Sequence, residues 1–353
     1  MASGAGSRSQ KDRSWKNTPL ALSVRSANLL VSWGVPLILL HLCDSIAQEV
    51  PRSENRRDLA VMDAFCGQAE ITRAFRDVGA KVGYFDLELM GEEGDILSMT
   101  GFRNMVKMIL RLRVGGLLIG GPPCGSWVWI NSATHQRRKF RIFGNTKLDY
   151  VKAANTITCR FILLGLLAIS RAAFFAGEQP GSSIMLSYPY MIYMATILQQ
   201  LYWDKVRFPM GAYGHPSTKP TILFGTLPYL QKFHRKLTNK DKRRIAKNKA
   251  IKKFQTVRKT VSKSGKVQVT GSYGLKRSAA YPPGFARFLV KTHLNFLANT
   301  KHLEKKYIPS PADPARQAPF NWRHAGLAEI KHSLQRKACD GSYTPILRSG
   351  LHD

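Results

Sequence analysis

Short apolar runs alternate with longer stretches of helical periodicity between Asp58 and Leu230. The apolar runs are bounded by Gly, Pro or Asp and predict buried strands, whereas the longer stretches predict helices. The predicted strands are Leu59–Phe65, Lys81–Phe85, Gly116–Ile119 and Ala172–Ala176, and the clearest predicted helices are Phe102–Leu112 and Lys147–Arg171. This alternation is typical of βαβ units. We therefore expect an α/β fold, with a mostly parallel sheet that is covered by helices on both faces.

The residues before this core form an N-terminal extension, 1–57. It begins rich in Ser, Gly and basic residues and continues with the apolar stretch Leu29–Cys43. A membrane-spanning helix needs about 20 apolar residues, so this stretch is short for a span. The following Ser45-Ile46-Ala47 has the small-x-small form of a signal-peptidase site. Three interpretations stay open: a targeting or membrane-associated segment, an amphipathic helix packed on the core, and a poorly defined N-terminus.

Two further segments follow the core at its C-terminal end. In residues 278–300, Pro283 suits a helix start, and apolar side chains then recur near one face, which predicts a helix that returns to the core. Residues 301–353 are interrupted by Pro309, Pro311, Pro314 and Pro319, and we expect a loosely ordered tail there.

The charge of the chain is strongly positive. Its 353 residues contain 54 Lys and Arg against 22 Asp and Glu, a formal charge of +32. This excess favours a polyanionic partner, most simply nucleic acid, with an anionic membrane as the second choice. The charge excess limits the kind of binding partner but says nothing about the fold.

Half of this excess lies in one segment, residues 231–277, which hold 17 Lys or Arg and a single acid, Asp241. A charge run is often a solvated tail, but so many uncompensated charges repel each other unless a polyanion meets them. We therefore predict that this basic segment contacts nucleic acid. The candidate phosphate contacts are Lys242, Arg243, Arg244, Lys247, Lys252 and Lys253.

The five cysteines are odd in number and far apart, and none forms a Cys-x-x-Cys pair. Reduced thiols are therefore expected, without a disulfide framework or a cysteine zinc site. The sequence predicts no metal and no obligate protein partner.

Acidic side chains follow the first predicted strands. The first strand ends in Asp63-Ala64-Phe65-Cys66-Gly67, a turn in which backbone can approach a ligand, and Asp86 ends the second. A carboxylate at Asp86 can accept hydrogen bonds from both hydroxyls of a ribose, and Asp95 could accept one from an adenine amino group. Because ligands bind beyond the carboxyl ends of parallel strands, these residues describe a nucleoside-binding edge.

The next strand ends in a more specific motif, Gly120-Gly121-Pro122-Pro123-Cys124-Gly125-Ser126. It presents the Cys124 thiol on a rigid loop. Packing in a core does not explain a cysteine at such a position, whereas a role as a nucleophile does. Glu178 follows the last predicted strand and would face the same crevice.

In this order of motifs the chain resembles the cytosine-5 methyltransferases that use S-adenosylmethionine. Asp63, Phe65, Cys66 and Gly67 match the cofactor turn, Pro122 and Cys124 match the nucleophile loop, and Glu178 matches the acid of the Glu-Asn-Val element. Asp86 (or Glu88) corresponds to the ribose acid and Asp95 to the adenine contact. Tyr213–Gly225, with Lys219, resembles the family's Tyr-Gly-x-Pro-Gln-x-Arg-x-Arg strand, and the basic segment occupies the place of the target-recognition region.

The resemblance implies a Rossmann-like methyltransferase core over 58–230 and S-adenosylmethionine as cofactor. It also implies methyl transfer to C5 of cytosine in DNA, with Cys124, Glu178 and Lys219 as the catalytic residues. The chain departs from the family at Ala69, where a glycine is expected, at Gln179-Pro180, and in lacking the two arginines of the Tyr-Gly element. Two alternatives therefore stay open: a catalytically silent relative that binds nucleic acid, and a methyltransferase for RNA cytosine. Function and charge favour the nucleus.

Overall fold

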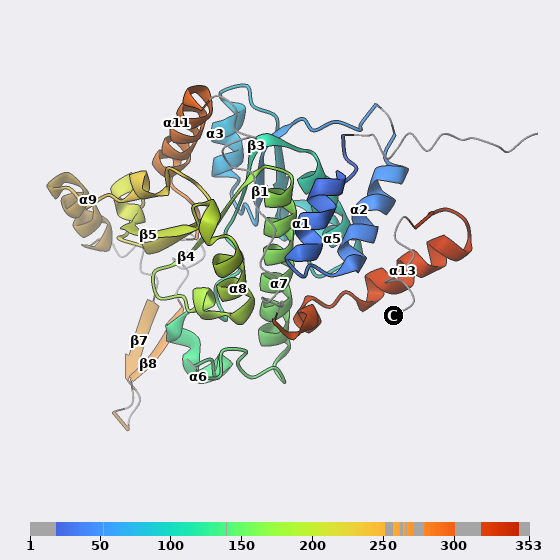
Figure 1. Ribbon diagram of the computed structural model, residues 1–353. Coiled ribbons are helices and arrows are strands. Elements are labelled where there is room, and N and C mark those ends of the chain that lie inside the picture. Colours follow the sequence, from blue (N-terminus) through green and yellow to red (C-terminus); the bar gives the residue numbers. More distant parts are fainter. Residues whose placement is uncertain are drawn as a thin grey trace, which may run out of the picture.

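A six-stranded sheet of order β2-β1-β3-β4-β6-β5 lies at the centre of the fold in this computed structural model (Figure 1). Strands β1 to β4 run parallel, while β6 is antiparallel to both β4 and β5. The strands are β1 (Leu59–Ala64), β2 (Val82–Phe85), β3 (Leu112–Gly120), β4 (Phe174–Pro180), β5 (Asp204–Pro209) and β6 (Pro220–Gly225). The structure describes residues 19–51, 53–138, 140–250, 257–261, 264–265, 267–271, 279–300 and 319–345.

Helices cover both faces of this sheet. On one face α3 and α11 pack against each other, and on the other α7 contacts α1, α5 and α8 (Figure 1). The α-helices are α1 (Val24–Ser32), α2 (Leu37–Glu49), α3 (Glu70–Arg76), α4 (Leu87–Met90), α5 (Met99–Leu110), α6 (Ser132–His135), α7 (Asp149–Ser170), α8 (Pro189–Ile197), α9 (Asn239–Ala250), α11 (Pro283–Asn299) and α13 (Ala328–Cys339). Short 3-10 helices are η2 (Gly91–Gly94), η3 (Trp129–Asn131), η4 (Met185–Ser187), η5 (Gln199–Leu201), η6 (Met210–Tyr213), η7 (Leu230–Phe233) and η8 (Pro319–Ala325).

The strands are apolar on both sides because the sheet is buried on both sides. Successive strand residues point to opposite faces, so Met62 and Leu118 enter the core under α7 while Val61 and Leu117 enter the core under α3 and α11. The predicted α/β fold with a mostly parallel, helix-covered sheet is confirmed, and it is compatible with a Rossmann-like fold. The strand and helix boundaries differ from those predicted by a few residues.

The N-terminal extension, from residue 19, is a packed part of this fold. Helices α1 and α2 lie against α7 and α5, and Leu39, Cys43 and Ser45 are fully buried. Of the three interpretations of this segment, the structure therefore favours the helix packed on the core. Among the described residues one helix, α7, is long and apolar enough to cross a membrane. Because 83% of its apolar window is buried inside the fold, this is weak evidence for a span.

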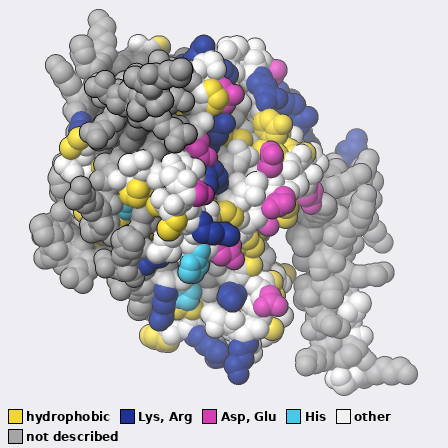
Figure 2. Space-filling view, turned by 90° about the vertical axis from the view of Figure 1, so that its right-hand side faces the viewer, with side chains coloured by type: hydrophobic (Ala, Val, Ile, Leu, Met, Phe, Trp, Pro, Cys, Tyr) yellow, Lys and Arg dark blue, Asp and Glu magenta, His cyan; other side chains and the backbone are white. Residues whose placement is uncertain are grey.

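The prediction of a loosely ordered C-terminal tail is wrong for residues 319–345. Helices η8 and α13 pack on α7 and α2, and they bury Trp322, Ile330 and Leu334. Lys337 of α13 pairs with Glu49 of α2 at 2.8 Å, and Arg103 of α5 pairs with the same carboxylate. Figure 2 shows acidic side chains beside Lys and Arg on the right-hand face of the molecule in Figure 1. Pro319 is the first residue of η8, a position at which proline is compatible with a helix, so it does not indicate a loose tail.

Candidate active site

The predicted site residues gather at one edge of the sheet. The chain runs from β1 outward to β2 and then returns to β3 on the other side of β1, so the strand order reverses between β1 and β3. In open α/β sheets, ligands bind outside the carboxyl ends of the strands at such a switch point. Gly67, Asp86 and Cys124 follow the carboxyl ends of β1, β2 and β3, and Glu178 lies near the end of β4. Lys219 joins them because β6 runs antiparallel and begins one residue later.

Asp86 ties the first two of these loops together. Its Oδ2 accepts a hydrogen bond from the Gly67 N–H at 2.9 Å, and its Oδ1 accepts one from the Glu88 N–H at 2.9 Å. The backbone N–H groups of Phe65 and Cys66 donate to the Phe85 carbonyl, at 2.7 and 3.3 Å. Asp86 is half-buried and each carboxylate oxygen can accept further bonds, so this side chain can hold a ligand hydroxyl. Glu88 lies next to it and is exposed.

Asp63 and Cys66 lie under this loop. The Asp63 carboxylate is 1% exposed and accepts hydrogen bonds from the Thr72 N–H at 3.0 Å and the Thr72 Oγ1 at 2.8 Å, which fixes α3 to β1. Burial raises the pKa of Asp63 to about 7 and the pKa of the Cys66 thiol to about 12. Asp63 is thus hydrogen-bonded within the fold and Cys66 is buried. Contact of either side chain with a cofactor stays a prediction.

The Asp95 loop is also held firmly. Oδ1 of Asp95 accepts a hydrogen bond from the Leu97 N–H at 2.8 Å. The carbonyls of Ile96 and Leu97 accept from Nη1 of Arg160 on α7, at 2.6 and 2.9 Å. Arg160 also donates to the carbonyls of residues 325 and 326, so one guanidinium joins this loop to the C-terminal region. The sequence alone gave no sign of this link.

The loop that carries Cys124 is supported by Gln179. This side chain is 1% exposed, and its Nε2 donates to the Pro122 carbonyl at 2.7 Å. The Cys124 carbonyl accepts from the backbone N–H groups of Trp127 and Val128, at 2.8 and 3.1 Å, which closes a turn after the cysteine. Gln179 therefore holds the loop that carries Cys124.

A buried arginine holds the residues that follow the cysteine. Arg137 is 2% exposed, and it donates to the Ser126 carbonyl and hydroxyl as well as to Asn155 of α7. Its guanidinium lies 3.6 Å from the ring centre of Trp127, which is fully buried. Burial lowers the pKa of Arg137 to about 10, still far above neutrality, so the side chain stays a cation. Sequence analysis missed Arg137, because its partners are set by the fold of the loop.

Cys124, Glu178 and Lys219 are close enough to influence one another. Burial, and next the charge of Glu178, raise the pKa of the half-buried Cys124 thiol, while Lys219 lowers it. Burial also raises the pKa of Glu178, which is 7% exposed, and Lys219 opposes this shift. The structure thus brings together the thiol, the carboxyl and the cation that the sequence predicted, in a setting where the carboxyl retains its proton more readily than in water.

Tyr281 completes this cluster and was not predicted. Its hydroxyl donates to Oε2 of Glu178 at 3.4 Å, and the Lys219 ammonium lies 5.5 Å from its ring centre. Lys219 in turn donates to the Ala279 carbonyl at 2.9 Å. A Cβ at Gly121 would lie 2.6 Å from the Tyr281 hydroxyl, so a larger residue there would displace that hydroxyl. The residue lies just before the predicted return helix, but no local pattern points to its role.

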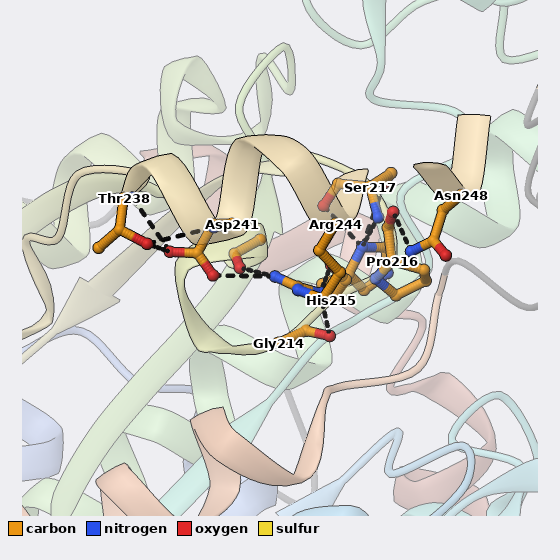
Figure 3. Close-up of polar contacts among 9 residues, drawn as sticks. Gly214, His215, Pro216, Ser217, Thr238, Asp241, Arg244 and Asn248 are labelled. Carbon is orange, nitrogen blue, oxygen red and sulfur yellow. Dashed lines mark hydrogen bonds and ion pairs between the residues drawn. The ribbon is translucent and has the colours of Figure 1, made fainter. Parts of the chain in front are cut away.

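The basic segment has a structured, anchored helix, α9. Arg244 donates to the carbonyls of Gly211, Gly214 and His215, at 2.6 to 2.8 Å, and Asn248 donates to the Pro216 carbonyl at 3.1 Å (Figure 3). Asp241 accepts from Thr238 and from Arg244 at the start of the helix. One face of α9 is therefore fixed to the turn that leads into Lys219. This part of the basic segment is not a solvated tail.

The opposite face of α9 carries cations. Lys242, Arg243 and Lys247 are exposed, so of the predicted phosphate contacts these three face solvent, whereas Arg244 serves as an anchor. Two strands that pair antiparallel, β7 (Val257–Val261) and β8 (Val267–Gly271), follow the helix. Lys252 and Lys253 lie outside the described residues.

Comparison with family models and with curated proteins finds no match. Within the described residues, no three His, Cys, Asp or Glu side chains gather in a way that could hold a metal ion.

Proposed function

We propose that the protein transfers a methyl group from S-adenosylmethionine to C5 of cytosine in nucleic acid, with DNA as the first expected substrate. The observation that carries this proposal is that the Glu178 carboxyl and the Lys219 ammonium both lie against Tyr281, at the same sheet edge as the loop of Cys124 and the loop of Asp86. A thiol, a buried carboxyl and a cation are the groups that covalent activation of a cytosine ring requires.

The residues around Asp86 fit the proposed cofactor. From Asp86 to Asp95 the chain holds five acidic residues and no basic one, in a protein that is otherwise strongly basic. This excess of acid favours a ligand that carries a sulfonium and an ammonium group. The Asp86 carboxylate would accept from the ribose hydroxyls, and the side chain of Phe65, which packs on Phe85 and Phe161, would line the floor. The cofactor, when bound, supplies an electrophilic methyl group.

The reaction begins at Cys124. Its thiolate would form a bond to C6 of the cytosine, and the electron pair of the C5–C6 double bond would shift through C4 to N3. Protonated Glu178 would give its proton to N3, so that no isolated negative charge develops in the ring. C5 then has enamine character and would accept the methyl group as its bond to the sulfonium sulfur breaks, which leaves the cofactor as a neutral thioether. Loss of the C5 proton to a base, return of the N3 proton to Glu178 and departure of the Cys124 sulfur would restore the aromatic ring, the neutral carboxyl and the thiolate.

Lys219 would stabilise this sequence electrostatically. Its ammonium favours the thiolate form of Cys124, and it is fixed by the Ala279 carbonyl at 2.9 Å. The ammonium is suited to hold the cytosine carbonyl oxygen or a phosphate. In duplex DNA the target base must also leave the stack, which costs a few kcal/mol, and phosphate contacts made by α9 would offset this cost.

The test is covalent trapping. The full-length protein is mixed with S-adenosylmethionine and with DNA or RNA that contains 5-fluorocytosine, whose fluorine blocks the final elimination. We expect a complex with DNA that survives denaturation and is lost in Cys124→Ser. An adduct with RNA alone would change the substrate to RNA. Cofactor binding without an adduct on either nucleic acid would contradict cytosine methylation.

A catalytically silent nucleic-acid-binding protein is the second candidate. The observation that favours it is the exposed cationic face of α9, which can bind phosphates whether or not Cys124 reacts. Gel-shift or anisotropy titrations with unmodified DNA and RNA test it directly. Salt-sensitive binding that persists in Cys124→Ser, in a protein that neither binds the cofactor nor forms an adduct, would support this function over the first.

A further inference from the structure

The segment that enters α11 holds two members of the proposed active site. The Ala279 carbonyl accepts a hydrogen bond from the Lys219 ammonium, and two residues later the Tyr281 hydroxyl reaches Oε2 of Glu178 at 3.4 Å. Glu178 and Tyr281 are 103 residues apart in sequence. The structure therefore uses this segment to position side chains at the end of β4 and the start of β6.

The two oxygens of the Glu178 carboxyl have unlike surroundings. Oε2 accepts the hydrogen bond from Tyr281, whereas Oε1 is buried and has no hydrogen-bond partner among the described residues. The nearby Thr221 hydroxyl donates to the Lys219 carbonyl instead, at 3.0 Å. Glu178 is 7% exposed, so water does not readily replace the missing partner. A buried polar atom without a partner is costly unless a ligand meets it.

This asymmetry decides where a proton on Glu178 resides. A neutral carboxyl has one carbonyl oxygen and one hydroxyl oxygen, and the carbonyl oxygen is the better acceptor. Tyr281 can only donate here while it keeps its own proton, and burial raises the pKa of Tyr281 well above its usual value. With Oε2 as the acceptor, the proton falls on Oε1, the oxygen that lacks a partner.

We propose that Tyr281 is a positioning residue that directs the Glu178 proton to Oε1, from which it is donated to a ring nitrogen of the bound base. This inference rests on the proposed function for the identity of the base, whereas the placement of the proton can be measured on the protein alone. It also gives a reason for Gly121, since a Cβ there would lie 2.6 Å from the Tyr281 hydroxyl and 3.4 Å from Oε2 of Glu178.

Infrared difference spectroscopy of the full chain tests this placement. The carbonyl stretching band of neutral Glu178 is assigned by its loss in Glu178→Gln. In Tyr281→Phe, which keeps the ring, the carbonyl oxygen loses a donor, so we expect this band to move to higher frequency. Tyr281 also favours the ionised carboxylate, so its removal should move the titration midpoint of the band to higher pH. Tyr193→Phe, which removes another buried hydroxyl bonded to the Trp33 carbonyl, should leave the band unchanged.

A band that stays in place in Tyr281→Phe, or the absence of any Glu178 band at neutral pH, would overturn the inference. If Tyr281→Phe fails to fold, Gly121→Ala offers a second way to displace the hydroxyl, and the same shift is expected. In the trapping reaction we expect Tyr281→Phe to slow adduct formation about tenfold. A wild-type protein that forms no adduct would contradict the proposed function, while the infrared result would still decide the role of Tyr281.

Discussion

Two regions of this molecule carry opposite charge, and they treat their charged side chains in opposite ways. Between Asp44 and Asp95, 12 acidic residues outnumber six basic ones, whereas residues 231–277 contain 17 basic residues and one acid. In the acidic region the structure engages carboxylates internally: Asp86 accepts backbone N–H groups, and Asp58 pairs with Arg111. In α9 the single acid lies at the start of the helix, and exposed cations such as Lys242 and Lys247 face solvent.

Under the proposed function, the two regions would serve different ligands, the cofactor and the nucleic acid. Internal hydrogen bonds fix the shape of a loop, which suits a small ligand that must be held in one position. Solvent-facing cations on a rigid helix suit a polyanion, which binds through many similar contacts. If this view is correct, the affinities for cofactor and for nucleic acid respond to separate sets of substitutions. The predictions below test that separation.

The largest effect is expected from Asp63→Asn, and it concerns stability. Because the pKa of Asp63 is about 7 in the folded protein and about 3.9 in an unfolded chain, the folded state binds the extra proton between these values. Stability of the wild type should therefore fall as pH rises through this window, by up to about 4 kcal/mol. Asn cannot ionise and keeps an oxygen for Thr72, so the variant should gain stability over the wild type as pH rises through this window, and the difference should be largest above about pH 7. Urea unfolding across this range measures the difference.

Asp58→Asn provides the control of opposite sign. Partial burial disfavours ionisation of Asp58, but hydrogen bonds and charge from Arg111 and Lys81 outweigh it and lower the pKa. Asp58 therefore stabilises the fold above its unfolded pKa, and this contribution is lost as pH falls through the lower folded value. Asp58→Asn should thus destabilise the protein at neutral pH. If both variants respond to pH in the same direction, burial is not what distinguishes Asp63.

The next effect concerns the basic region. Reversing three exposed charges with Lys242→Glu, Arg243→Glu and Lys247→Glu should weaken nucleic-acid binding about a hundredfold at low salt. Because three phosphate contacts are lost, binding releases fewer counterions. The slope of log affinity against log salt concentration should therefore be smaller by about three. Cofactor affinity, measured by calorimetry, should not change. Equal loss of both affinities would contradict the separation of the two regions.

A matched variant controls for net charge. Arg113→Glu, Arg287→Glu and Lys291→Glu change the charge by the same amount at exposed positions outside the basic segment. Arg113 lies near the start of β3, and the other two lie on α11. This variant should keep most of its nucleic-acid affinity. If it loses as much as the α9 variant, the total charge of the protein governs binding and α9 has no special role.

The sequence was a good guide where the chemistry is local. The carboxyl ends of strands are marked by Gly, Pro and Asp, so the positions of Asp86, Cys124 and Glu178 at one edge followed from the predicted sheet. Apolar periodicity also predicted α7 and α11 close to their observed bounds. These features depend on neighbours within about one turn or one strand, which a sequence displays directly.

The sequence was a poor guide to contacts that the fold creates between distant residues. Tyr281 meets Glu178 across 103 residues, and Arg160 joins the Asp95 loop to carbonyls more than 160 residues away. Arg244 looked like its neighbour Arg243, because both lie in one charge run. Their roles separate only when α9 is formed, since adjacent helical residues point in directions about 100° apart.

A smaller effect on binding is expected from Asp86→Ala. Removing the carboxylate takes away two hydrogen bonds that shape the loop and one acceptor for the cofactor, so S-adenosylmethionine affinity should fall about thirtyfold. Nucleic-acid affinity should stay within about twofold of the wild type. Glu88→Ala is the matched control, because Glu88 is exposed and Asp86 bonds only its backbone N–H. A larger loss in Glu88→Ala would assign the ribose contact to Glu88.

The smallest effect separates two adjacent arginines of α9. Arg244→Ala removes donors from three backbone carbonyls of the turn before Lys219, so α9 should loosen, with protease cleavage in 239–250 accelerated about fivefold. Nucleic-acid affinity should fall only by a similar factor, because the exposed cations remain. Arg243→Ala should reduce affinity to a comparable extent and leave the cleavage rate unchanged, since its side chain is exposed. If both variants were cleaved at the wild-type rate, the contacts in Figure 3 would not be what orders α9, and a cationic helix without an anchor would account for binding equally well.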